Sequence, residues 1–469
     1  MFTISHAHFA MHRSSKNRLF VCIMSLLAIV SVALAIRLYP VFVSPEKERF
    51  GMGPFGDSYK YHIIAYNLFL GNGFSVTEVL GGSPICRPAF THGPGYPFFI
   101  SLIYALFSDD KILASMSRWH TALDRVRIAQ CVMDSLCCVL IFFIARIICP
   151  GSLWIPLISS ALYAVAPYNI YYTRALLSET LAAFLITLFV LLAATGIQAM
   201  KPLPLFRAGL TFGLVLLTRS EYLLFTPFFA LFLFRVCRGR AASAMSISSA
   251  YLLGVAIILT PWSIRNFIVL KKPLILTAGR IGQVLYGGTY HNKENWRGWD
   301  VFADNIFIDD RERQTVAALQ RNQSRTLYSG NIDEVETMDR QYLELALRKI
   351  RERPFQTAKN WFFKTPLLWY QGAFPIFRDP EPAGGWFVFY FVFALCAFFA
   401  EGARGRRLMC PVTLLFAYLT IMFIPLYVEP RYSVPVMPGI ICLAGIGVGN
   451  TIALVRKQVV ALQGRLSRR

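Results

Sequence analysis

The sequence predicts an all-α polytopic membrane protein, and three observations carry this prediction. Of the 469 residues, 55% are hydrophobic and only 16% are charged, whereas soluble domains carry about 25% charged residues. Ten apolar segments approach the ~20 residues that a helix needs to cross a bilayer. Two long polar segments, 40–127 and 266–384, interrupt them. We therefore expect a single membrane domain of about ten transmembrane helices, with interfacial helices in two long loops.

Hydropathy places each expected span. The spans are 19–39, 128–148, 153–172, 180–200, 205–218, 222–236, 243–264, 385–400, 408–428 and 434–455. The run 95–107 has 13 residues and is short for a span, so it predicts an interfacial or re-entrant helix. If it crossed, the sidedness of all later spans would reverse. The first span could be a signal peptide, because "ALA" at 33–35 resembles a cleavage site. Nine further apolar segments favour an uncleaved span.

The net charge of +21 indicates topology rather than nucleic-acid binding, because many arginines border apolar segments. With the N-terminus inside, the connections at 146–151, 201–207, 235–240 and 401–407 and the C-terminal tail are basic. The outer turns at 171–179, 218–221 and 428–432 each hold one arginine and one glutamate. The positive-inside rule thus predicts cytoplasmic termini and two long loops that face outward.

Ionisable residues gather on the predicted outer face. They are Asp57, Arg87, Arg174, Glu179, Arg219, Glu221, Arg265, Glu429 and Arg431. Helix capping and snorkelling explain any single pair, but the one-sided gathering indicates a site. Arginines bind phosphate in a forked geometry, and a carboxylate accepts a proton from an attacking hydroxyl. Together these groups suit transfer from a lipid phosphate to an alcohol.

Asp57 is the candidate base. It follows Gly56 and starts a stretch in which Tyr59, Ile63 and Tyr66 recur at helical spacing, closed by the glycines of "GNGFS" (71–75). A helix N-terminus would keep the carboxylate ionised. The alternative reading is that Asp57 only caps the helix.

Seven motifs carry a resemblance over almost the whole chain. They are "GDSYKYHIIAYNLFLGNGFS", "RPAFTHGPGYPFFISLIYALF", "YYTRALLSETLAAFL", "AGLTFGLVLLTRSEYLL", "LTPWSIRNFIV", "ALRKIRERP" and "EPRYSVPVMP". In order and spacing the chain resembles the bacterial glycosyltransferases of family 39. These belong to the GT-C membrane class, with the protein O-mannosyltransferases and the lipid A aminoarabinose transferases.

The resemblance implies a polyprenyl-phosphate-linked sugar as donor and inverting transfer on the periplasmic side, with Asp57 as base. It implies a substrate-binding role for Tyr61, four residues after the acid, and it places Lys60 where the aminoarabinose transferases have arginine. The resemblance implies further substrate contacts from Glu179 of "SE" and Tyr432 of "EPRY". It implies that Arg431 of "EPRY" and Arg265 of "PWSIRN" bind the donor phosphate.

The chain departs from the family in two places. Ser58 follows the acid, where the mannosyltransferases carry an Asp-Glu pair, so transfer of mannose to protein is not implied. Where many relatives have a basic residue followed by two prolines, this chain reads "RPAFTHGPGYP". Either Arg87 or His92 could then take the phosphate-binding role of that basic residue. Metal use varies in the class. We expect no metal ion at the site. His92 and Asp57 are a possible pair of ligands if one is bound.

Other functions stay open at this stage. A transporter or flippase of a lipid-linked sugar would use the same arginines, but transporters bind substrate near the midplane. A polysaccharide polymerase or ligase would share the chemistry with a different acceptor. A membrane scaffold leaves the one-sided charges unexplained. The expected partners are the lipid-linked donor, a glycan, lipid or protein acceptor, and the bilayer, with no nucleic acid.

Overall fold

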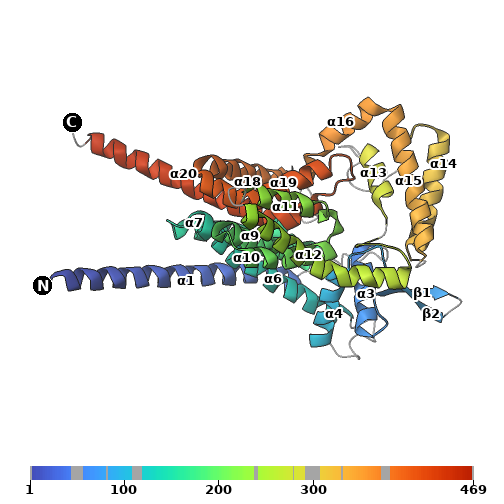
Figure 1. The fold of residues 1–469 in the computed structure, drawn as a ribbon, viewed down its shortest axis with the longest axis horizontal. Coiled ribbons are helices and arrows are strands. Elements are labelled where there is room, and N and C mark those ends of the chain that lie inside the picture. Colours follow the sequence, from blue (N-terminus) through green and yellow to red (C-terminus); the bar gives the residue numbers. More distant parts are fainter. Residues whose placement is uncertain are drawn as a thin grey trace.

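The computed structural model describes residues 3–43, 56–80, 83–107, 119–236, 241–277, 279–290, 307–328, 331–370 and 381–466. Its long helices run side by side, and both termini lie at one end of the bundle (Figure 1). The opposite end carries the elements of the two long polar segments, and we call it the loop end.

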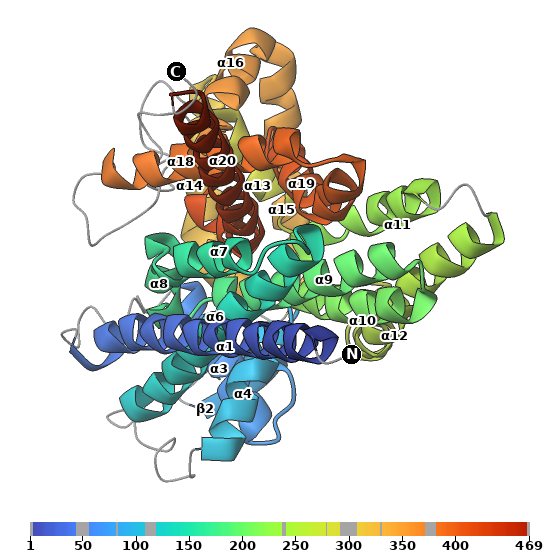
Figure 2. The same ribbon diagram turned by 90° about the vertical axis from the view of Figure 1, so that its left-hand side faces the viewer.

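Among the described residues, five helices are long and apolar enough to cross a membrane. They include Leu19–Val43 of α1 (Thr3–Val43), Thr121–Ile148 of α6 (Trp119–Ile148), α9 (Glu179–Ala199), Ala244–Leu270 of α12 (Ala241–Leu270), and Pro430–Gln463, which spans η3 (Pro430–Val436) and most of α20 (Met437–Leu466). Shorter bundle helices are α7 (Trp154–Ala164), α10 (Pro202–Thr218), α11 (Phe225–Val236), α18 (Glu381–Ala400) and α19 (Ala403–Met422). The predicted all-α polytopic fold is confirmed. Seen from the terminal end, α18, α19 and α20 lie on one side of α7, and α1 and α4 lie on the other (Figure 2).

The predicted span 153–172 is not one helix. It breaks after α7, and α8 (Pro167–Arg174) starts with a proline at its first turn. Pro167 cannot donate a backbone hydrogen bond, and it disfavours helical backbone at the residue before it. Ala166 accordingly adopts an extended conformation, with φ −67° and ψ 106°. The break lies at the loop end, beside the start of α20.

The first long loop contains a helix, a hairpin and a second helix. Helix α3 (Asp57–Phe69) begins at the predicted acid and ends in a turn where Gly71 has φ +80°, a left-handed conformation that favours glycine. Strands β1 (Ser75–Leu80) and β2 (Ser83–Pro88) pair antiparallel. The sequence reading did not predict this hairpin. Helix α4 (Gly95–Phe107) packs against α3 and α6.

The second long loop forms a helical unit with its own apolar core. Its helices are α13 (Ile281–Tyr290), α14 (Asp310–Tyr328), α15 (Ile332–Glu352), α16 (Pro354–Lys364) and α17 (Leu367–Tyr370). Helix α15 ends at Glu352, and Pro354 starts α16. A buried ion pair joins Lys349 Nζ to Glu312 Oε1 at 3.0 Å inside this unit.

The second-loop unit is clamped to the segment 425–427, just before η3. A Cβ on Gly288 would lie 2.0 Å from the carbonyl oxygen of Pro425, so only glycine allows this approach. Lys364, fully buried, donates to the carbonyl oxygens of Gly288 at 2.8 Å and Leu426 at 2.5 Å. Burial lowers the pKa of Lys364 to about 7. The clamp fixes where η3 begins.

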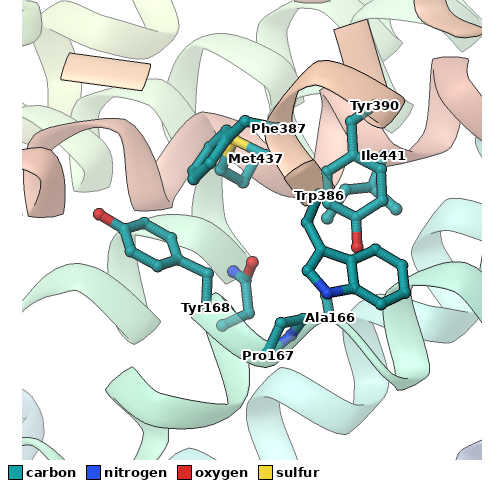
Figure 3. Close-up of a pocket in the computed structure, with 9 residues that line it drawn as sticks. Ala166, Pro167, Tyr168, Trp386, Phe387, Tyr390, Met437 and Ile441 are labelled. Atoms are coloured by element: carbon teal, nitrogen blue, oxygen red, sulfur yellow. The ribbon is translucent and has the colours of Figure 1, made fainter. Parts of the chain in front are cut away.

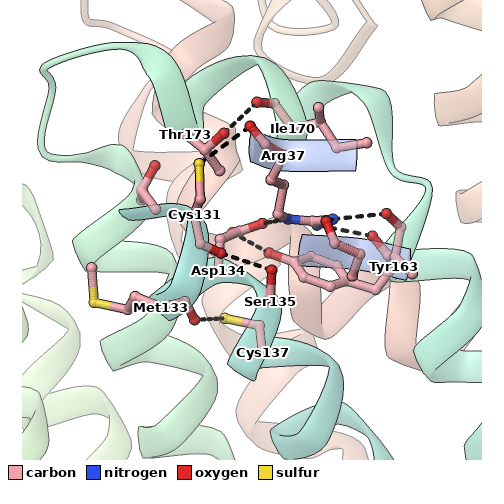
Figure 4. Close-up of polar contacts among 12 residues, drawn as sticks. Arg37, Cys131, Met133, Asp134, Ser135, Cys137, Tyr163, Ile170 and Thr173 are labelled. Atoms are coloured by element: carbon pink, nitrogen blue, oxygen red, sulfur yellow. Dashed lines mark hydrogen bonds and ion pairs between the residues drawn. The ribbon is translucent and has the colours of Figure 1, made fainter. Parts of the chain in front are cut away.

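A buried charge pair ties three membrane helices together. Arg37 of α1 donates from Nε to Oδ2 of Asp134 on α6 at 2.5 Å, and the hydroxyl of Tyr163 on α7 donates to Oδ1 at 2.5 Å (Figure 4). The rest of the guanidinium donates to backbone carbonyls, including Ala164 at 2.8 Å. Ion pairs within a membrane protein persist only when satisfied in this way.

A charged cluster at the loop end

Asp57 and Arg431 meet at the loop end although 374 residues separate them in the chain. Gly56 precedes α3 in an extended conformation, so Asp57 is the first helical residue rather than the cap. Arg431 donates from Nη2 to Asp57 Oδ2 at 3.1 Å. The Nε2 atom of His92 lies 3.5 Å from Oδ1 of the same carboxylate. The first loop and η3 therefore form one site.

Glu179 extends this cluster from the first turn of α9. Its carboxylate is buried, with 2% of the residue exposed, and its Oε1 atom lies 3.1 Å from Arg219 Nη1 and 3.9 Å from Arg431 Nε. Arg219 also pairs with Glu221 at 2.5 Å, and Arg431 with Glu429 at 2.5 Å. The second oxygen of Glu179 has no hydrogen-bond partner within the described part of the chain. It can accept a hydrogen bond from a bound molecule.

Two tyrosines border the charges. Tyr61 packs edge to face on His92, with ring centroids 5.3 Å apart, and on Tyr96 at 5.0 Å. The Tyr432 ring stacks on Phe423, and the guanidinium carbons of Arg219 and Arg431 lie 5.5 Å and 5.6 Å from its centroid. The structure thus brings Tyr61, His92, Glu179, Arg431 and Tyr432 together around Asp57.

Asp57 is ionised at neutral pH. Burial alone would raise its pKa, but hydrogen bonding to His92 and the charge of Arg431 outweigh burial and hold the pKa well below its usual range. Burial lowers the pKa of His92, although Asp57 opposes this shift. His92 is therefore neutral at pH 7, and its Nδ1 atom pairs with the Thr91 hydroxyl at 2.9 Å. The carboxylate is held in the form that accepts a proton.

Lys60 lies one turn after Asp57 on α3 and is buried. Burial and the neighbouring charge of Arg280 lower its pKa to about 8, while Asp57 opposes the shift. Lys60 therefore loses its proton within a range in which an ordinary lysine stays charged.

Arg280 is the site residue that sequence reasoning missed. Its charge acts on Asp57, Lys60 and His92, and its Nε atom has no partner among the described residues. Asp339 of α15 accepts from the backbone N–H groups of Gly282 at 3.1 Å and Gln283 at 3.0 Å. This cap fixes the start of α13, and with it Arg280. No spacing pattern in the sequence signals such a long-range placement.

Two predicted phosphate contacts lie in other surroundings. Arg265 donates to the carbonyl oxygens of Phe74 at 3.0 Å and Ala89 at 3.2 Å, and its guanidinium carbon lies 4.9 Å from the Trp262 ring centroid. These contacts hold the base of the hairpin to α12. Arg87 lies on β2, opposite Val76. A phosphate-binding role for either arginine stays a prediction.

No group of three or more His, Cys, Asp or Glu side chains is placed to hold a metal ion in the described ranges. Asp57 and His92 are neighbours, as a shared ligand role would need, but no third ligand of these types joins them there. The expectation that the site uses no metal stays a prediction.

The chain is similar in fold to two solved structures of an archaeal oligosaccharyltransferase. The archaeal oligosaccharyltransferase AglB from Archaeoglobus fulgidus, in complex with an inhibitory peptide and a dolichol-phosphate, has a TM-score of 0.53 at 12% identity and covers 95% of this chain. The Archaeoglobus fulgidus oligosaccharyltransferase tethered to an acceptor peptide containing the NVT sequon has a TM-score of 0.50, 14% identity and 90% coverage. ArnT from Cupriavidus metallidurans in the apo state has a TM-score of 0.37 at 13% identity, covering 93% of this chain and 78% of its own.

This chain spans about half the length of the two oligosaccharyltransferases, 52% and 49%. No protein-family model and no curated protein sequence matches it. The likeness therefore shows the fold alone.

Proposed function

We propose that this protein is a glycosyltransferase of the family 39 type. It would move a hexose or pentose from a polyprenyl-phosphate carrier to an acceptor hydroxyl, with inversion, on the periplasmic face of the inner membrane. The observation that carries the proposal is the ionised Asp57 carboxylate, held 3.1 Å from Arg431 beside Lys60 and Arg280. The dolichol-phosphate in the AglB complex supports a lipid phosphate as the donor.

The reaction follows from these groups. Asp57 accepts the proton of the acceptor hydroxyl as its oxygen attacks the anomeric carbon of the donor sugar. The bond from that carbon to the phosphate oxygen breaks on the opposite face, and its electron pair leaves with the phosphate. Arg431, Lys60 and Arg280 stabilise the charge that develops there. Attack from the face opposite the leaving group inverts the anomeric configuration.

The remaining cluster residues would bind and orient the substrates. The unpaired oxygen of buried Glu179 accepts a hydrogen bond from a substrate hydroxyl, and Arg219 holds that carboxylate in place at 3.1 Å. Tyr61, His92 and Tyr432 line the approach to Asp57. Arg87 and Arg265 are further candidates for the donor phosphate. The acceptor is a glycan, a lipid or a protein.

Envelope analysis and reconstitution test this function together. Mass spectrometry of envelope glycans should show one sugar residue missing in cells without the protein. Vesicles containing the purified chain should transfer labelled sugar from a polyprenyl-phosphate carrier to acceptor extracted from those cells. Unchanged glycans, together with movement of the intact lipid-linked sugar between leaflets, would identify a flippase instead.

The donor affinity should depend on pH through Lys60. With its pKa at about 8, Lys60 is charged at pH 7 and largely neutral at pH 9, while a phosphodiester donor keeps its charge throughout. The KM for the donor should rise roughly tenfold over this range, because a factor of ten corresponds to the free energy of about one hydrogen bond to a charged group. In Lys60→Arg this rise should be absent, because arginine stays protonated.

The matched control is Lys272→Arg, since Lys272 forms ion pairs with Asp333 and Glu336 away from the cluster. It should show the wild-type rise. Parallel pH profiles for Lys60→Arg and the wild type would remove Lys60 from donor binding.

A further inference from the structure

Helix α16 is amphipathic in the opposite sense to a helix of a soluble domain. Phe355 and Phe362, about two turns apart on one face, are 91% and 75% exposed. The opposite face buries the polar side chains of Thr357, Asn360 and Lys364. A helix that packs on a protein in water buries its apolar face and exposes its polar one. The outward face of α16 therefore suits an apolar medium.

Hydrogen bonds fix which face of α16 turns outward. Asn360 donates from Nδ2 to the carbonyl oxygen of Thr289 on α13 at 2.8 Å. Lys364, in the last turn, forms the clamp on segment 425–427. Rotating α16 to bury its phenylalanines would remove the amide and the ammonium from these carbonyl oxygens, and buried polar groups without partners are unfavourable. The exposed apolar face is thus built into the packing of the second-loop unit.

The next helix, α17, enters the membrane bundle. The ring centroid of Trp369 lies 5.7 Å from that of Phe391 on α18 and 4.6 Å from that of Phe416 on α19. Trp386, near the start of α18, is partly exposed beside Tyr390 (Figure 3), and tryptophans of this kind gather at the bilayer interface. Phe391 lies five residues further along α18, about 7.5 Å deeper. Trp369 therefore lies below the interface, and α16 ends just before it.

Helix α16 also lies at the outer edge of the molecule. In both views it projects on the side of α18, α19 and α20 at the loop end, and other helices do not cover its outer side (Figures 1 and 2). A bilayer around the bundle surrounds this edge. Because α17 anchors the end of α16 at the depth of the bundle, the exposed phenylalanines face the leaflet at the loop end.

A lysine on the exposed face favours lipid over a protein partner. Lys359 is exposed between Phe355 and Phe362. Lysine is depleted at the core of protein interfaces, whereas at a bilayer its stem lies along acyl chains and its ammonium reaches the headgroups. We propose that the apolar face of α16 is seated in the leaflet at the loop end. The bilayer then supports one side of α16, and the other side holds segment 425–427, next to η3.

Photochemical labelling tests this seat. A benzophenone side chain replaces Phe355 or Phe362 in the full chain, which is placed in nanodiscs of phosphatidylethanolamine and phosphatidylglycerol and irradiated. Mass spectrometry should find phospholipid adducts at both positions. Adducts to a second copy of the chain in place of phospholipid, or no lipid adduct at either position, would overturn the proposal.

Two exposed apolar residues are the matched controls. Phe228 on α11 is 62% exposed on the membrane bundle and should give phospholipid adducts. Ile85 on β2 is 43% exposed, and its hairpin lies at the far end of the loop end (Figure 1), so it should give few. The adduct yields at Phe355 and Phe362 should be close to that at Phe228 and severalfold above that at Ile85. Yields no higher than at Ile85 would place α16 in water.

Hydrogen exchange in the same nanodiscs tests the link to segment 425–427. The backbone N–H of Tyr427 donates to the carbonyl oxygen of Val284 on α13 at 2.8 Å and reports on the clamp. In the double variant Phe355→Gln, Phe362→Gln this N–H should exchange severalfold faster, because glutamine gives up the contact with acyl chains that supports α16. Ile85→Gln should exchange as the wild type does. An equal rate in the double variant and the wild type would reject the link.

Discussion

Asp57→Asn is expected to abolish sugar transfer while the protein stays folded and membrane-inserted. Asparagine keeps the shape of the side chain and a hydrogen bond to Arg431, but it cannot accept the proton of the acceptor hydroxyl. Loss of a general base lowers rates by roughly 10²–10⁴. Turnover at saturating donor and acceptor, measured in vesicles, reads out this fall.

The pH profile of the wild type adds a second reading. Asp57 acts in its ionised form, which predominates above its pKa. Burial alone would raise this pKa, but hydrogen bonding to His92 and the charge of Arg431 outweigh burial and hold the pKa well below its usual range. Protonation of Asp57 should therefore lower the rate only at a pH below the usual range of an aspartate.

The matched control is Asp124→Asn on α6. Its carboxylate is 27% exposed and pairs with Arg127 at 2.8 Å, whereas that of Asp57 is 28% exposed and pairs with Arg431 at 3.1 Å. This variant should keep near wild-type turnover. Near wild-type turnover in Asp57→Asn would reject Asp57 as the base.

Arg37→Leu is expected to have the largest effect on stability. It leaves the Asp134 carboxylate buried in the bundle without its cation, and breaking a buried pair in this way lowers the free energy of unfolding by roughly 3–5 kcal/mol. The double variant Arg37→Leu, Asp134→Leu should recover much of the loss, because neither charge remains. Unfolding of the purified protein in mixed detergent micelles measures both changes.

Arg348→Leu serves as the comparison for an exposed pair. Arg348 lies 2.6 Å from Asp309, with both side chains more than a third exposed, 36% and 39%. Its loss should change the free energy of unfolding by less than about 1 kcal/mol. Equal effects of Arg37→Leu and Arg348→Leu would show that the membrane pair adds no special stability.

Much of the fold could be predicted from the sequence, because a bilayer demands long apolar helices. Hydropathy located the spans and separated the two long loops. Pro167 lies inside the predicted span 153–172 and could have indicated the break, but the span was predicted as one continuous helix. The hairpin of β1 and β2 was not predicted, because both strands are short and their stability depends on packing beside α3 and α12.

The candidate site was predictable to the extent that sidedness gathers charges. Placing Asp57, Glu179 and Arg431 on one face anticipated contacts that the structure shows. Spacing carried no information about Arg280, whose position depends on Asp339 capping α13 from another helix. Spacing also could not show that the Arg265 guanidinium donates hydrogen bonds to the carbonyl oxygens of Phe74 and Ala89.

The clamp on segment 425–427 has a consequence during biosynthesis. Asp57 leaves the ribosome 374 residues before Arg431, and the contacts of segment 425–427 with the second-loop unit form only after that segment has been made. A nascent chain therefore holds an acid without its arginine partner for most of its synthesis. Any catalytic competence would arise in a single late step, when segment 425–427 docks onto Gly288 and Lys364.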